Sequence, residues 1–119
     1  MAGELGLTTE TPTLQQLKVA DCVEHYLLAD AAATVAVGQV LQYNTTEDNW
    51  DDYTSGMAAA LYVVCAEAKT ISADTLVRCI VKGSVRKTAL DATAQADDEI
   101  DVALIKSGII PVGEDVRVA

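Results

Sequence analysis

The sequence is poor in aromatic and in basic residues. Only 4% of its 119 residues are aromatic and none is phenylalanine, so the core must be built from Val, Ile, Leu and Ala. Eight basic residues stand against 18 acidic ones, which gives a net charge of -10. This charge argues against a nucleic-acid partner, because phosphates would be repelled. It suits a protein that stays soluble at high concentration, and it also fits a solvated surface with no special role.

Long apolar segments and paired cysteines are missing as well. No run approaches the roughly 20 residues that a membrane-spanning helix needs, so no membrane partner is expected. The opening MAGELGLTTETPTLQQL has neither a basic n-region nor an apolar h-region and does not read as a signal peptide. Cys22, Cys65 and Cys79 are widely spaced and form no C-x-x-C pattern, which predicts free, buried thiols in a reducing cytosol.

Residues suited to catalysis are equally scarce. His25 is the single histidine, and no motif surrounds it that would indicate a nucleophile relay. Acidic clusters at 47–48, 51–52 and 97–99 fall in expected turns or at a helix start, whereas acid–base chemistry needs a buried carboxyl with a raised pKa. TTEDNWDD lacks the spacing of an EF-hand, and no glycine-rich phosphate loop occurs. The sequence therefore predicts no enzyme, no metal site and no cofactor.

The residues that are present predict one mainly β domain. Half of the chain is apolar, and its length suits a single core. Strands are expected over 35–43 and 57–67, with 61–65 buried on both faces. Segment 18–28 fits a helical spacing, but its Val, Tyr and Cys favour extended structure.

Two turn regions are expected to separate these strands. Residues 29–34 read as a loop, and residues 44–56 as a polar turn that holds Trp50 and Tyr53. Trp50 can be a core or lid residue, or an exposed aromatic anchor at an interface.

The pattern after a further turn at 70–74 predicts a hairpin followed by a helix. LVRCIVK alternates, and Gly83-Ser84 suits a type II′ turn, so 76–90 is expected to form a hairpin. A single short helix is expected from Ala96, with acidic residues at its start and Gly108 at its C′ position. IIPV then leaves as an edge or irregular piece, and DVRVA as a short final strand.

Residues 1–16 form a different region, rich in Thr, Glu and Gly and without an apolar period. They predict an extended N-terminal arm ahead of a domain that covers 17–119.

The order of these pieces resembles a known family. VAVGQVLQYNTTEDNW is similar to the strand with a glycine and the following aromatic-bearing turn of tailed-phage head decoration proteins of the lambda type. SGMAAALYVVCAEA resembles that family's small-residue stretch and apolar strand, and RCIVKGSVRKTAL its hairpin. The acidic helix, Gly108 and the arm also occupy matching places, and the resemblance runs from Leu28 to the C-terminus.

The resemblance implies a small β-tulip or β-clip-like domain that binds the outside of a phage head as homotrimers after assembly in the host cytoplasm. Its partners would be the major capsid protein and further copies of itself. The arm would add a strand to the capsid protein through Thr8, Thr9, Thr11, Pro12, Thr13 and Leu14. Trp50, Tyr53 and Gly56 would lie at the trimer or capsid interface. The alternative is a small enzyme or ligand-binding domain on a similar scaffold, because fold does not decide function.

Overall fold

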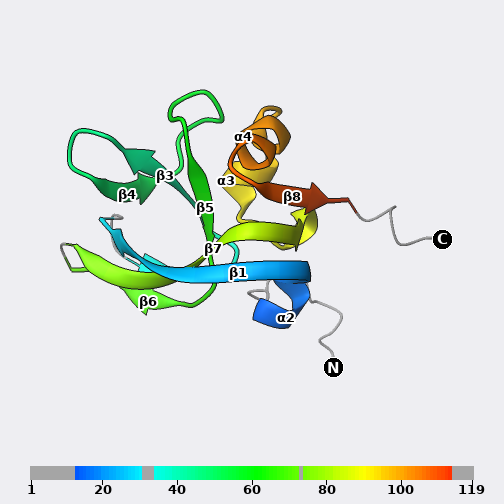
Figure 1. Cartoon of the computed structure of the whole chain (residues 1–119), viewed down its shortest axis with the longest axis horizontal. Coiled ribbons are helices and arrows are strands. Elements are labelled where there is room, and N and C mark those ends of the chain that lie inside the picture. Colours follow the sequence, from blue (N-terminus) through cyan, green and yellow to red (C-terminus); the bar gives the residue numbers. More distant parts are fainter. Residues whose placement is uncertain (1–12, 31–33, 73, 114–119) are drawn as a thin grey trace.

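The computed structural model describes residues 13–30, 34–72 and 74–113. Its elements, in chain order, are α2 (Leu14–Leu17), β1 (Lys18–Ala29), β2 (Thr34–Val35), β3 (Val40–Asn44), β4 (Asn49–Asp52), β5 (Tyr62–Cys65), β6 (Lys69–Thr70), β7 (Thr75–Arg86), η2 (Lys87–Ala89), α3 (Ala92–Gln95), α4 (Ile100–Lys106) and β8 (Ile109–Val112). The domain is mainly β, as the sequence predicts (Figure 1).

The main sheet curls into a small barrel. Its strand order is β1-β4-β3-β5-β7-β8, and an additional pairing of β1 with β7 closes the ring. Most pairings are antiparallel, but β1 meets β4 in parallel at Ala29↔Trp50, and β8 runs parallel to β7 from Gly83↔Ile109 onward. The ring pairs β3 and β7 on both edges, whereas β8 lies at an edge of the sheet.

The barrel strands separate two hydrophobic clusters. Successive side chains of a strand point to opposite faces, so Val64 joins the outer cluster while its neighbour Cys65 joins the barrel interior. The outer cluster is covered by α3 and α4 and includes the fully buried Leu17. The predicted burial of β5 on both faces is confirmed for Tyr62–Cys65. Leu61 departs from it, because it lies just before the strand and is 45% exposed.

The predicted hairpin at Gly83-Ser84 is wrong. β7 continues through both residues as one 12-residue strand that pairs with β1 from Lys18↔Val85 to Ala29↔Thr75. Gly83 has a φ of +126°, and a Cβ on it would lie 2.6 Å from the Cys22 Cα atom. At this point the register of β1 shifts in a bulge, so the glycine serves the close crossing of two strands rather than a turn.

The ambiguous segment 18–28 belongs to the domain, since β1 covers it. The residues just before it are also structured. Thr13 is the N-cap of α2 in a reciprocal capping box with Gln16. The expected extended arm is therefore wrong for Thr13 to Gln16, and residues 1–12 lie outside the described part of the chain.

Short helices occupy more of the C-terminal third than expected. The predicted helix is α4, which starts at Ile100 rather than Ala96, and Gly108 follows it with the expected positive φ of +96°. The prediction of a single helix is wrong, because η2 and α3 precede it. β8 confirms the extended course of IIPV at a sheet edge, and the predicted strand over 115–119 lies outside the described residues.

The polar region 44–56 contains a strand that the sequence did not indicate. β4 pairs with β3 from Leu41↔Asp52 to Asn44↔Asn49, so residues 45–48 are the turn of a hairpin. Trp50 thus lies in the barrel wall rather than in a loop.

Candidate interaction surface

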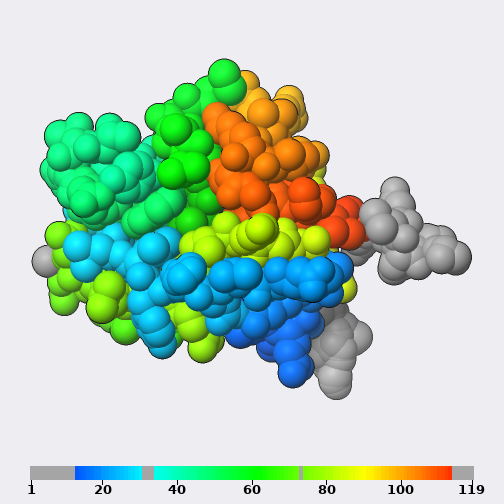
Figure 2. All heavy atoms as spheres, viewed as in Figure 1, coloured from blue at the N-terminus to red at the C-terminus, as the bar shows by residue number. Residues whose placement is uncertain are grey.

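One long strand edge stays open on the surface of the barrel. β1 pairs with β7 along its whole length, but its other edge meets β4 at Ala29↔Trp50 alone. From Lys18 to Leu28, no strand of the described residues pairs with this edge. Figure 2 shows β1, in blue, running uncovered across the front of the molecule. Unpaired N–H and C=O groups on such an edge can bind an extended segment of another chain.

Large apolar side chains are exposed along the same strand. Val19 is 42%, Val23 43% and Tyr26 60% accessible to solvent. An ion-pair cluster lies among them, in which Glu24 binds Lys18 at 2.5 Å and Arg78 of β7 at 3.4 Å. β1 therefore combines hydrogen-bonding groups with apolar side chains, which are the two components of strand addition.

The barrel interior opens to solvent beside this edge. A cavity of about 210 Å³ lies between β1, β4, β5 and β7, with Leu27, Trp50, Leu61, Val63 and Val81 in its wall. It exists because β1 and β4 share only the contact at Ala29↔Trp50. We call this cavity the barrel mouth. Its wall can take an apolar group, since clefts with apolar walls are the usual sites for such groups.

Trp50 is a half-buried wall residue of the mouth. Its side chain packs against the barrel interior, and its ring centroid lies 5.1 Å from that of Tyr43. The Tyr43 hydroxyl donates a hydrogen bond to Asp48 in the hairpin turn. Trp50 therefore packs against the core as one of the two expectations had it, while part of its side chain stays accessible, and its role as an interface anchor stays a prediction.

Tyr53 and Gly56, the other two expected interface residues, lie inside the domain. Tyr53 is 7% exposed, and its hydroxyl donates to the Asp97 carboxylate at 2.5 Å. The Gly56 N–H donates to the same oxygen at 2.9 Å, and a Cβ on Gly56 would lie 2.6 Å from the Glu99 carbonyl oxygen. These contacts fasten the segment after β4 to the start of α4 and account for the burial of both residues.

The same bonds change two pKa values. The hydrogen bond from Tyr53, together with those from the Glu99 and Gly56 amides, lowers the pKa of Asp97 below its usual value. Burial and the bond to Asp97 raise the pKa of Tyr53. Asp97 is therefore ionised and Tyr53 protonated, so the hydroxyl can donate and the carboxylate can accept. We call this hydrogen-bonded connection the Asp97 tether.

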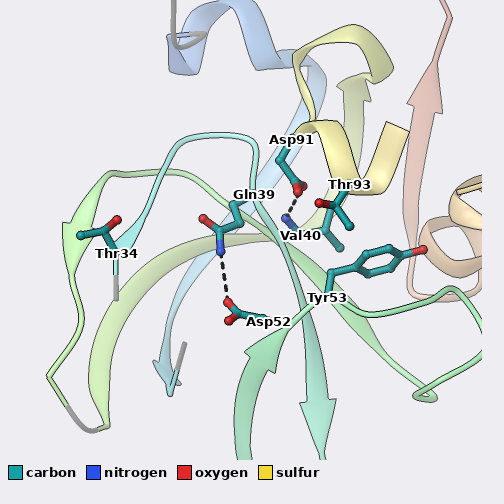
Figure 3. A pocket seen from close by; sticks show the side chains of 7 residues that line it. All are labelled: Thr34, Gln39, Val40, Asp52, Tyr53, Asp91 and Thr93. Carbon is teal, nitrogen blue, oxygen red and sulfur yellow. Dashed lines mark hydrogen bonds between the residues drawn. The ribbon is translucent and has the colours of Figure 1, made fainter. Parts of the chain in front are cut away.

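A polar cleft of about 360 Å³ lies on another side of the barrel (Figure 3). Its two carboxylates serve the fold, since Asp52 accepts a bond from Gln39 at 3.3 Å and Asp91 accepts one from the Val40 amide at 3.1 Å. Burial raises the pKa of Asp91, while backbone amides, that of Val40 first among them, act in the opposite direction. Figure 3 shows the Tyr53 hydroxyl directed away from both carboxylates. The hydrogen bond between Val40 and Asp91 in this cleft thus holds the start of β3 against the N-terminus of α3.

The remaining predicted residues are dispersed. Thr8, Thr9, Thr11 and Pro12 lie outside the described residues, while Thr13 caps α2 and Leu14 packs against the outer cluster. His25 is exposed on β1, and the three cysteines are free thiols. Within the described ranges, no group of three or more His, Cys, Asp or Glu side chains is placed to hold a metal ion.

Sequence reasoning missed the open edge of β1 with Val19, Val23 and Tyr26. Segment 18–28 carries apolar residues at both odd and even positions, so as a strand it places some of them on each face. This distribution could have indicated exposed apolar side chains on the strand. It could be interpreted in that way only after the segment had been assigned as a strand.

Comparison with known proteins found no family model that matches the chain and no curated protein that is similar to it. None of the helices in the described part is long and apolar enough to cross a membrane.

Proposed function

We propose that this chain is a structural decoration protein that binds the outside of a tailed-phage head as a homotrimer and stabilises the expanded shell. Two lines of argument support the proposal. The resemblance of the sequence to lambda-type decoration proteins suggests the virion as the location, the major capsid protein as the partner and a homotrimer as the oligomeric state. The open edge of β1 beside the barrel mouth supplies a surface suited to a protein partner.

The edge and the mouth act together in this proposal. An extended segment of a neighbouring chain adds to β1, where main-chain hydrogen bonds provide affinity and alternate side chains provide specificity. Ordering such a segment costs about 1–2 kcal/mol per residue in backbone entropy. An apolar side chain seated in the mouth against Trp50 offsets part of this cost, since buried aromatic anchors contribute about 2 kcal/mol or more at interfaces.

The N-terminal arm supplies a second contact. Residues 1–12 precede the capped turn α2, whose Leu17 is fully buried in the outer cluster. Leu17 thus fixes the point from which the arm reaches the major capsid protein.

The proposal is tested by co-sedimentation with expanded heads that lack the protein. Tyr26→Asp places a charge on the open strand, and Val102→Asp is its matched control on α4, because the two side chains are 60% and 59% exposed. We expect wild type and Val102→Asp to sediment with the heads and Tyr26→Asp to be retained at least tenfold less. Circular dichroism verifies that both variants fold.

Two different results would contradict different parts of the proposal. Wild-type protein that stays in the supernatant at saturating concentration refutes decoration itself. Equal retention of all three proteins refutes the role of β1 while leaving the arm as the contact.

The barrel mouth also favours a second candidate, a domain that binds a small apolar ligand. Titration with hexanoate, followed by Trp50 fluorescence, separates the two. A saturable change that is lost in Val81→Asp supports ligand binding. An unchanged spectrum supports a site that is completed by a protein partner.

A further inference from the structure

Two of the three cysteines face each other across the sheet. Cys65 of β5 and Cys79 of β7 are register partners in an antiparallel pairing. Both side chains are fully buried in the barrel interior, and the Cys79 thiol donates to the Val77 carbonyl at 3.5 Å. Cys22 is separate from them, half-buried at the bulge of β1, where its thiol donates to the Ser84 carbonyl.

The pair occupies a non-hydrogen-bonded position of the ladder. The Ala66 N–H donates to the Arg78 carbonyl at 2.8 Å, which places the inter-strand bond one residue beyond the cysteines. The backbone of Cys65 bonds in the other direction, to Gln39 at 2.8 Å and Gly38 at 3.0 Å. Cα atoms at such positions are about 4.5 Å apart, which lies inside the range of about 4.4–6.8 Å that a disulfide spans.

Burial protects these thiols, since neither side chain is accessible to solvent. The neighbouring Cys79 thiol and burial raise the pKa of Cys65, and the thiolate is the reactive form. The strands that carry them are joined over a short distance, because β5 and β7 pair through Val64↔Ile80 and Cys65↔Cys79. Local opening of such a short contact is the step that admits a reagent.

We propose that Cys65 and Cys79 form a reversible disulfide site, in which a thiol oxidant converts the facing pair into a bond that links β5 to β7. With diamide as the oxidant, one cysteine sulfur adds to the N=N bond. The second cysteine sulfur then attacks the first and breaks its new S–N bond. The S–S bond forms as the two thiols lose two electrons and two protons, and diamide leaves as the hydrazine. A reducing thiol reverses the reaction by exchange.

The experiment uses the full-length protein and diamide under conditions in which circular dichroism shows the native fold. After denaturation and alkylation, mass spectrometry should find Cys22 alkylated and the peptides of Cys65 and Cys79 linked. Because the bond closes a loop of about 15 residues, the melting temperature should rise by as much as about 10 °C and return after reduction.

Two variants make the result specific. Cys22→Ala should still form the link and show the same rise, whereas Cys79→Ala should show neither. The diamide treatment is repeated in mild urea, which opens the barrel locally. Alkylation of all three cysteines after treatment both without and with urea would overturn the proposal. A link that involves Cys22, or a bond that lowers the melting temperature, would overturn it as well, because either result shows that the two strands do not hold the pair in bridging geometry.

Discussion

Gly83 allows the bulge of β1 to cross β7, and replacing it with alanine tests that contact. The substitution adds one carbon atom to a residue whose φ is +126°. The new Cβ would lie 2.6 Å from the Cys22 Cα atom and 2.7 Å from the Asp21 carbonyl oxygen. Both are backbone atoms, so β1 itself has to move to make room.

The expected loss has two components. A side chain at this φ strains the backbone by about 1–3 kcal/mol. Forcing an extra carbon into a packed contact costs about 1–3 kcal/mol more. The sum of about 2–6 kcal/mol is a large share of the roughly 5–15 kcal/mol by which a domain of this size is stable. Gly83→Ala should therefore be close to unfolding at room temperature.

Gly108→Ala is the matched control. Gly108 also has a positive φ, +96°, but the nearest atoms to its Cβ position are 3.9 Å away. It therefore carries the backbone strain without the overlap. The difference of about 1–3 kcal/mol between the two variants isolates the close approach of β1 to β7.

Urea unfolding measures both variants, with circular dichroism for the sheet and the fluorescence of Trp50, the single tryptophan, for the barrel. Hydrogen exchange at the β1 amides reports whether the loss is local. If Gly83→Ala lost no more stability than Gly108→Ala, β1 would not pass close to Gly83. A hairpin turn at Gly83-Ser84 would then again be the better explanation of that glycine.

Three further predictions address the core, the Asp97 tether and the arm. Leu41→Ala should lower the free energy of unfolding by about 2–5 kcal/mol, because Leu41 is fully buried. Leu61→Ala should lower it less than half as much, because Leu61 is 45% exposed. Equal losses of melting temperature in the two variants would contradict the barrel. The lowered pKa of Asp97 means that its carboxylate adds stability above the ordinary value of 3.8, and this contribution is lost as pH falls through the lower folded-state pKa. The urea midpoint should therefore drop more steeply from about pH 6 to about pH 3 in wild type than in Asp97→Asn, and parallel curves would rule out the tether. Deleting residues 1–12 should leave the melting temperature unchanged, because Leu17 anchors the chain, yet reduce occupancy on heads; full occupancy would remove the arm from the proposed function.

The sequence by itself determined those features that depend on neighbouring residues. Alternation and β-branched residues identified the mainly β class and the strand around Val63. The glycine at 108 marked the C-terminal end of α4, because such a terminus is specified within one turn of chain, whereas the helix was expected to start at Ala96 and starts at Ile100. The capping pair of Thr13 and Gln16 is a local signal of the same kind, although the prediction of an extended arm passed over it.

Tertiary structure alone decided which strands meet and what is exposed. Gly83 resembles a turn glycine until β1, more than 60 residues earlier in the chain, is laid across it. Leu61 and Tyr53 exchange their expected places for the same reason, since exposure depends on which elements cover a residue and not on its own apolarity. The open edge of β1 and the barrel mouth beside Trp50 follow from the divergence of two strands that share a single register pair. No local pattern encodes such a gap, because strand pairing is fixed by contacts between segments distant in the chain.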